Sequence, residues 1–238
     1  MTHEQVIVLH TFRYGESGHI VQVLSREHGL LSCMVKGRRR SPLPPVLMQP
    51  LSLVDVVMDV RPNRQFQFLR ESAPLALYDG IAGNPAKNAM ALFLCEILCR
   101  ALRESPADVR LFDFVADSVA VLNRVERGVA NFHLVFLLRL TRFLGLFPEV
   151  DAATVGGYFD LEACTFTAKP PLHGHFLEPQ DTARLPLLLR MRYETMHLFR
   201  LSGRERNRFL QLLNDYYRLH CPGFPELKSL SVLREVFA

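Results

Sequence analysis

Four cations stand close together where an apolar, strand-like run ends in the first fifth of the chain. The run LLSCMVK ends at Lys36, and Gly37, Arg38, Arg39 and Arg40 follow before a proline-rich turn. Flexible cations beside a glycine can approach the phosphates of a nucleic-acid strand and release its condensed counterions. These residues therefore predict a DNA-binding site at this strand end. A solvated loop that only adds solubility is the other interpretation.

Further candidates for the same surface lie at other predicted strand ends. Arg13, Arg26 and Arg64 could extend the positive patch, and Tyr14 lies in a predicted turn where its ring would be exposed. Small barrels that bind single strands combine such cations with aromatic rings on which the bases stack. We therefore expect Tyr14 to supply a stacking ring.

The stretch QFQF raises the question of which side chains face the barrel interior. Phe66 and Phe68 share one face of a strand, and Gln65 and Gln67 share the other. Rings at this spacing are more often core than surface. We therefore expect both phenylalanines inside the barrel rather than on a stacking surface.

A second pair of cations interrupts an otherwise apolar helix predicted over residues 129–146. Arg139 and Arg142 are three residues apart and therefore share a helix face. There they could hold the C-terminal carboxylate of a peptide beside an apolar pocket. Pairing with acids at the rim of the core, or exposure to solvent, is the alternative.

Neither a metal site nor a catalytic site is predicted. Cys164, His173 and His175 are of ligand type but include no Cys-x2-Cys pair, and Cys95 with Cys99 lies in an apolar helix where packing is the simpler role. The sequence contains no phosphate-binding glycine loop, dinucleotide-binding glycine turn, nucleophile elbow or His-Glu-x-x-His helix. We expect no bound metal, no cofactor and no catalysis.

Composition and charge limit the class of protein. The 238 residues are 49% hydrophobic and 22% charged, with a formal net charge of +4, which is ordinary for a globular protein. The sequence shows neither a stretch apolar enough to span a membrane nor a secretory signal, so we expect a cytoplasmic protein. The five cysteines suit reduced thiols. Eight arginines between residues 184 and 218 form a second basic region.

The hydrophobic pattern changes near residue 80 from that of strands to that of helices. Five strand-like runs in about 70 residues, without a helical crossover, predict a closed antiparallel barrel of the OB-fold type, although the count also fits an SH3-like barrel. The fold class is therefore α+β, with a five-stranded barrel domain at 1–80 and an α-helical domain at 81–238 that contains a small irregular or β insertion at 148–180. Asn84 before Pro85 is typical of a helix start, and Ser202 with Glu205 is typical of a capping box. Helices are expected at 85–104, 107–124, 129–146, 182–200, 202–220 and 228–236.

Several segments in collinear order resemble the bacterial RecO family of recombination mediators. Near the N-terminus these are the YGES turn at 14–17, the SREHG strand end at 25–29 and the basic VKGRR strand end at 35–39. Further along, LCEILCRALRE, FHLVFLLRLTRFLGLFPEVD and LKSLSVLREVF resemble helical segments of the family. Many relatives carry four zinc-binding cysteines in the region that corresponds to 148–180. This chain has only Cys164 there, so the metal is not expected.

The resemblance implies an OB-fold joined to a helical domain that acts without catalysis in recombinational DNA repair. Such proteins bind single- and double-stranded DNA, anneal complementary strands, contact the C-terminal tail of single-stranded DNA-binding protein (SSB), and join RecR in loading recombinase on SSB-coated DNA. On this hypothesis the protein is a monomer when alone and works at the nucleoid. The barrel's DNA-binding mouth would comprise Lys36, Arg38, Arg39 and Arg40, with Arg13, Arg64 and Tyr14 beside it, and the SSB tail would contact Arg139 and Arg142.

Two other classes of function remain open from the sequence. One is a protein-interaction adaptor in which the helical domain docks acidic partners and the barrel is only structural. The other is an undetected hydrolase or transferase, which would require a pocket with coupled titratable groups.

Overall fold

The computed structural model describes residues 2–16, 18–36, 41–61, 63–76, 78–148 and 157–237. It divides into two compact units, one made of Met1–Arg124 with Leu227–Val236 and the other of Val125–Glu226 with Phe237–Ala238. The predicted α+β class is confirmed, because a closed five-stranded barrel precedes a helical region that carries a small three-stranded sheet. None of the helices in the described ranges is both long and apolar enough to cross a bilayer.

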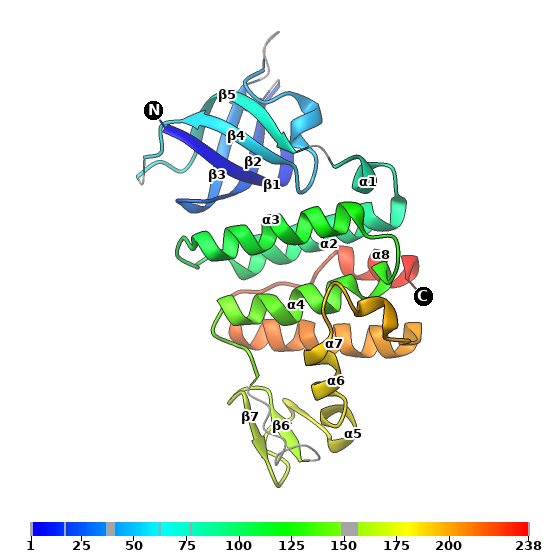
Figure 1. The fold of residues 1–238 in the computed structure, drawn as a ribbon. Coiled ribbons are helices and arrows are strands. Elements are labelled where there is room, and N and C mark those ends of the chain that lie inside the picture. Colours follow the sequence, from blue (N-terminus) through cyan, green and yellow to red (C-terminus); the bar gives the residue numbers. More distant parts are fainter. Residues whose placement is uncertain are drawn as a thin grey trace. The chain divides into compact units, whose positions relative to one another are not determined.

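The barrel is formed by the five predicted strands (Figure 1). They are β1 (Thr2–Tyr14), β2 (Gly18–Ser25), β3 (Gly29–Lys36), β4 (Leu53–Met58) and β5 (Gln67–Ala76). The strands close in the order β1-β2-β3-β5-β4, and β1 also pairs with β4. All ladders are antiparallel except the short parallel contact between β3 and β5. Closure leaves no long open edge on which another chain could pair.

Alternate residues of each strand fill the barrel interior. They are mostly valines, because β-branched side chains pack well on a pleated, buried surface. The short helix η1 (Pro45–Met48) follows the proline-rich turn and adds Leu47 to this core. The valines of the core cluster are Val6, Val8, Val21, Val23, Val35, Val54 and Val56.

Three helices continue the first unit after the barrel: α1 (Asp79–Ala82), α2 (Pro85–Ala101) and α3 (Val109–Arg124). The predicted cap of α2 is confirmed, since Asn84 Oδ1 accepts hydrogen bonds from the amides of Ala86 and Lys87 at 3.0 and 3.2 Å. Helix α3 begins two residues later than expected. Its cap is Asp108, whose carboxylate accepts from the amide of Arg110 at 2.8 Å.

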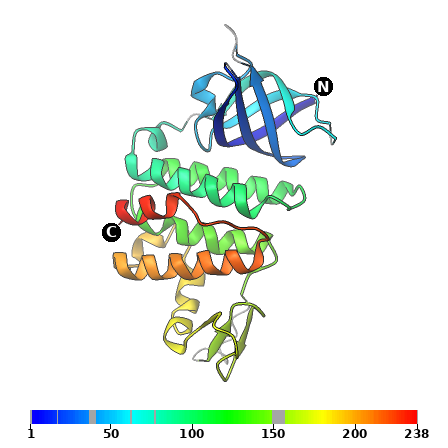
Figure 2. The same ribbon diagram turned by 180° about the vertical axis from the view of Figure 1, so that it is seen from behind.

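The last helix of the chain, α8 (Ser229–Val236), lies against α2 although the two are far apart in sequence (Figure 2). The carboxylate of Glu96 on α2 accepts from the amides of Lys228 and Ser229 at 3.0 and 2.9 Å and from the Ser229 hydroxyl. Burial opposes ionisation, but the hydrogen bonds from Ser229 and Lys228 hold the pKa of Glu96 below its usual value. Glu96 therefore fixes the N-terminus of α8.

The second unit contains η2 (Val129–Asn131), the apolar helix α4 (Phe132–Phe143) and helix α7 (Gly203–His220). The predicted capping box of α7 is confirmed, because Ser202 and Glu205 exchange hydrogen bonds across the first turn. The predicted insertion contains β6 (Tyr158–Asp160), β7 (Thr165–Thr167) and β8 (Phe176–Leu177), paired in the order β7-β6-β8.

The single helix expected over 182–200 is wrong. This stretch forms α6 (Leu185–Arg190) and η4 (Met196–Leu198), and α5 (Pro179–Thr182) precedes them. The backbone leaves the helical course after Arg190, where the ring of Tyr193 stacks on Phe132 with centroids 4.8 Å apart. Aromatic stacking on a buried neighbour therefore outweighs local helix propensity in this segment.

Candidate nucleic-acid interface

A β-bulge in β1 divides the outer face of the barrel into two parts. The pairing of β1 with β2 shifts between Val8 and His10, so that both Val8 and Thr11 turn inward and His10 turns outward. Before the bulge, β1 is held against α2, and Cys95 Sγ lies 3.9 Å from the carbonyl oxygen of Val8. After the bulge, the outward side chains of β1 are exposed.

The exposed part carries rings on β1 and β5, with β2 and β3 between them. Strand pairing aligns Phe12, Ile20, Met34 and Phe68 across β1, β2, β3 and β5. Phe12 is 41% exposed and Phe68 is 43% exposed at the two ends of this row. Ile20, between them, is only 2% exposed, so Phe12 and Phe68 are the uncovered apolar side chains of this row. Large apolar side chains left uncovered on a surface often mark interaction sites.

A second row runs parallel to the first, two residues closer to the strand ends. It aligns Tyr14, Gly18 and Lys36 on β1, β2 and β3. Tyr14 is 51% exposed, and its ring centroid lies 6.0 Å from that of Phe66. The rings Phe12, Tyr14, Phe66 and Phe68 are called the aromatic face below.

The expectation that Phe66 and Phe68 fill the core is wrong for Phe68, and Gln67 is the buried residue. Gln67 is 4% exposed, its amide nitrogen donates to the carbonyls of Arg61 and Arg64 at 3.0 and 3.3 Å, and its oxygen accepts from the Arg61 amide at 2.9 Å. The polar side chain takes the inner position because there it supplies hydrogen-bond partners to the backbone of the preceding turn. Leu69 lies two residues from Gln67, so both side chains point to the same side of the strand. The apolar Leu69, which belongs to the barrel core, therefore indicated in the sequence that Gln67 also faces inward.

Two of the predicted cations that the structure describes lie beside the aromatic face. Lys36 is exposed at the end of β3, and the guanidinium carbon of Arg64 lies 5.8 Å from the centre of the Phe68 ring. Arg13 is exposed on β1 between Phe12 and Tyr14 in sequence, so its side chain points to the other side of the strand. Within the described ranges, no carboxylate lies within ion-pair distance of Lys36, Arg13 or Arg64. The predicted residues 37–40, which include Arg38, Arg39 and Arg40, lie outside the described residues.

Arg26 does not belong to this surface, contrary to the interpretation from its position at a strand end. Its guanidinium donates to Asp113 on α3 at 3.1 Å and lies 5.9 Å from the centre of the Phe112 ring. Arg26 therefore joins the barrel to α3.

The second predicted pair of cations lies on α4 beside aromatic rings rather than acids. The guanidinium carbon of Arg139 lies 5.0 Å from the centre of the Tyr193 ring, and that of Arg142 lies 4.0 Å from the centre of the Phe147 ring. Stacking of this kind leaves the edge N–H groups of a guanidinium able to donate to a carboxylate.

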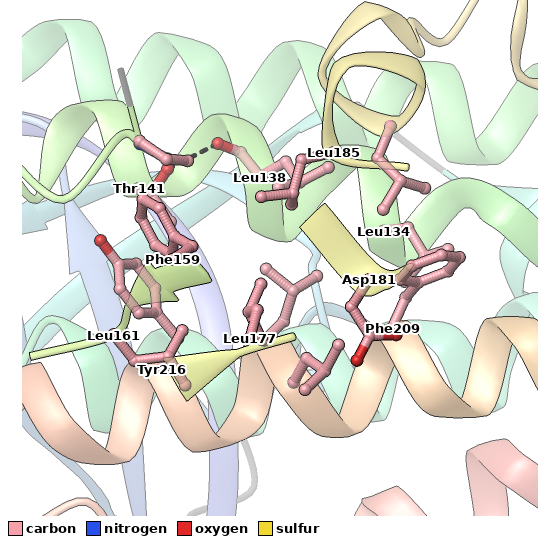
Figure 3. A pocket seen from close by; sticks show the side chains of 14 residues that line it. Leu134, Leu138, Thr141, Phe159, Leu161, Leu177, Asp181, Leu185, Phe209 and Tyr216 are labelled. Carbon is pink, nitrogen blue, oxygen red and sulfur yellow. Dashed lines mark hydrogen bonds between the residues drawn. The ribbon is translucent and has the colours of Figure 1, made fainter. Parts of the chain in front are cut away.

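The interior of the second unit contains a narrow apolar cavity of about 50 Å³ (Figure 3). Its two hydroxyl groups are already bonded, since Thr141 donates to the Leu138 carbonyl at 2.7 Å and Tyr216 donates to the Leu146 carbonyl at 2.7 Å. The cavity is far smaller than the roughly 300–1,000 Å³ of typical ligand pockets. It is therefore a gap in packing, and neither Arg139 nor Arg142 lines it.

The insertion is held by hydrogen bonds and packing where relatives are expected to carry zinc. Cys164 Sγ lies 2.8 Å from the Tyr216 hydroxyl oxygen and 3.5 Å from His220 Nε2, while His173 pairs with Asp160 at 3.2 Å. Burial and the hydrogen bond to Cys164 raise the pKa of Tyr216. In the part of the chain that the structure describes, no three metal-ligand side chains come together.

The closed five-stranded barrel and the helices that follow it define an OB-like protein with an appended helical region. Residues 1–78 match the family described as recombination protein O N terminal, and residues 82–231 match recombination protein O C terminal. The chain therefore belongs to the RecO family of DNA repair proteins.

Relatives of known name agree over almost the full chain. The DNA repair protein RecO of Phocaeicola vulgatus is 44% identical over 98% of this chain and 97% of that protein. The protein of the same name from Bacteroides fragilis is 43% identical, with 97% of each chain covered. That of Porphyromonas gingivalis is 35% identical, with 98% of each chain covered.

Proposed function

We propose that the protein binds single-stranded DNA on the aromatic face of the barrel and the cations around it. The observation that carries this proposal is that three exposed rings, Phe12 and Tyr14 on β1 and Phe68 on β5, lie on the same part of the barrel as cations without ion-pair partners. Rings offer stacking surfaces to any base, and cations neutralise phosphates without reading sequence. Binding is therefore strong at low ionic strength, nearly independent of sequence, and sensitive to salt.

The same surface suits annealing and acts without catalysis. Neutralised phosphates let two complementary strands approach, while their pairing edges stay free. Membership of the RecO family supports the partners proposed for this activity: single- and double-stranded DNA, RecR, and SSB-coated DNA on which recombinase is loaded. We place the protein as a monomer at the bacterial nucleoid.

Charge reversal of the described cations tests the proposed function. We expect the triple variant Lys36→Glu, Arg13→Glu, Arg64→Glu to weaken binding of a fluorescent oligothymidylate severely at low salt. Each lost phosphate contact also lowers the slope of log affinity against log salt by about 0.7. The measurement is a fluorescence anisotropy titration at several salt concentrations.

A matched control reverses Arg190, Arg192 and Arg218, which are exposed but lie outside the barrel. This control changes the net charge by the same amount. Equal loss of affinity in both triple variants would mean that total charge, rather than the barrel surface, decides binding. A folded barrel variant with unchanged affinity and salt slope would remove the proposed site.

We further propose that the SSB tail contacts Arg139 and Arg142. The observation that favours this candidate is that both guanidinium groups stack on rings and form no ion pair with a described carboxylate. An acidic peptide that ends in phenylalanine should lose affinity for the Arg139→Ala, Arg142→Ala variant, as measured by calorimetry. The Arg190→Ala, Arg192→Ala variant is the matched control, and unaltered peptide binding by the first variant would exclude this site.

A further inference from the structure

We propose that the strand-binding surface continues into a groove that the barrel forms with α2 and α8, and that this groove holds the sugar-phosphate backbone of a single strand leaving the aromatic face. The inference rests on the proposed function and adds a second segment of the DNA path. Nothing in the sequence pattern indicated this groove, because its walls come from five separate elements of the first unit.

The groove is large enough for an extended ligand. Its volume is about 680 Å³, within the roughly 300–1,000 Å³ of pockets that bind ligands. Its barrel wall is the part of the outer face nearest to α2. The barrel residues are Leu9, His10, Gln22, Leu30 and Ser32, and the opposite wall comes from α2 and α8.

Fixed contacts hold the walls of the groove in place. The Val8 carbonyl lies 3.9 Å from Cys95 Sγ on α2, and Glu96 fastens the first residues of α8 to α2. Arg26 and Asp113 join the barrel to α3. The groove is therefore formed before any ligand arrives, which lowers the entropic cost of binding.

The charge of the groove is positive. Arg100, Arg103 and Lys228 line it, and Glu96 is the one carboxylate among its lining residues. One oxygen of Glu96 accepts a hydrogen bond from Lys228 and the other accepts from Ser229. This carboxylate therefore serves to hold α8 against α2. No described carboxylate forms an ion pair with any of the three cations.

Arg100 adds positive charge to the wall of the groove. Its Nε is buried, has no hydrogen-bond partner among the described residues, and belongs to a side chain that lines the groove. An anionic group bound in the groove would neutralise the positive charge of the cations that line it.

The groove is continuous with the aromatic face through β1. His10 lines the groove, and its ring centroid lies 5.7 Å from that of Phe12. Phe12 is the β1 end of the exposed row of rings. A strand whose bases stack on the aromatic face would therefore pass His10 and bring its next phosphates toward Arg100 and Arg103.

An acidic protein segment also complements positive charge, but the observations favour a nucleic-acid strand. The groove adjoins a surface of stacking rings, and its barrel wall offers the side-chain donors Gln22 and Ser32 as well as apolar area. Phosphates, sugars and stacked bases use all three kinds of contact along one path. The groove is thus the second half of a single-strand site.

The test uses the full chain and two fluorescent oligothymidylates, one of roughly six nucleotides that spans the barrel face alone and one of roughly 25 that can also enter the groove. The variant is Arg103→Gln, Lys228→Gln, because both side chains are exposed and their loss leaves the fold intact. We expect several-fold weaker binding of the long strand, with a log-log salt slope lower by about 1.4, and unchanged binding of the short strand.

The matched control is Arg110→Gln, Arg124→Gln, which removes two exposed cations of α3 that do not line the groove. If the groove variant and this control bind the long strand equally well, the inference fails. The proposed function fails separately if Phe12→Ala, Phe68→Ala leaves binding of the short strand unchanged. A third outcome, in which a decaglutamate peptide loses affinity for the groove variant but the long strand does not, would assign the groove to an acidic protein segment and overturn the inference.

Discussion

The two basic regions of the chain look alike in the sequence but differ in what surrounds their cations. Around the aromatic face, Lys36, Arg13 and Arg64 have no described carboxylate within ion-pair distance, and Arg64 lies over an exposed ring. Between residues 184 and 218, Arg184 pairs with Glu205, and Arg208 pairs with Asp181 at 2.8 Å. Part of the positive charge of the second region is therefore used in ion pairs within the fold.

Arg206 shows this structural use most directly. Its guanidinium donates to the carbonyls of Leu201 and Phe237, at 2.7 Å for the latter. It joins the start of α7 to the last described residue of the chain. A count of arginines therefore does not locate a polyanion site, whereas cations that lack acids and border exposed rings do.

The largest expected effect comes from removing rings of the aromatic face. Replacement of Phe12 or Phe68 by alanine should raise the dissociation constant for a single strand roughly five- to 150-fold, since stacking of one base is worth about 1–3 kcal/mol. The salt slope should stay unchanged because no phosphate contact is lost. Anisotropy titrations measure both quantities.

Val109→Ala is the control for these variants, because Val109 is an exposed apolar residue of α3 outside the aromatic face. A ring variant that binds as tightly as this control would show that the exposed rings take no part in binding. The two basic regions would then differ only in whether carboxylates pair with their cations.

A moderate effect is expected from Gln67→Ala, which removes the buried side-chain amide that hydrogen-bonds to the backbone of Arg61 and Arg64. The backbone groups of Arg61 and Arg64 lose their partners, so the free energy of unfolding should fall by about 1–3 kcal/mol. Urea denaturation measures this loss. Gln65→Ala, at an exposed neighbour, is the control, and equal stability of the two variants would contradict the structural role of Gln67.

The smallest expected effect is a loss of stability at low pH that depends on Glu205. This carboxylate pairs with Arg184 in the second basic region. Hydrogen bonds from Ser202 and from Arg184 lower the pKa of Glu205 to about 2. A carboxylate whose pKa is lower in the folded state stabilises the fold above its unfolded pKa and loses that contribution as pH falls. Stability should therefore drop between about pH 4.5 and 2.

The Glu205→Gln variant provides the comparison for this pH dependence. Its free energy of unfolding should lie below that of the unmodified protein near neutral pH and approach it as the pH falls toward 2. The measurement is denaturation at a series of pH values. A constant difference across the series would show that ionisation of Glu205 does not stabilise α7.

Local chemistry in the sequence was enough to predict most of the elements. Alternating apolar residues predicted the five strands, because period two is how a strand buries one face. Asn84 with Pro85, and Ser202 with Glu205, predicted the starts of α2 and α7, since capping depends on neighbouring residues only. The basic strand end at Lys36 was likewise visible from its residue types.

Other features depended on contacts between distant residues. The break after Arg190 follows from the ring of Tyr193 stacking on Phe132. The groove arises because five elements meet, and the pairing of Arg26 with Asp113 joins residues 87 positions apart. No local pattern contains this information.

The sequence by itself determined most of the strands and helices and the places where cations cluster along the chain. Only the tertiary structure decided which side of each strand faces water and which cations have partners. The physical reason is that a turn's unsatisfied backbone brought Gln67 inward and left Phe68 outside, and that carboxylates reach some arginines only after the chain has folded.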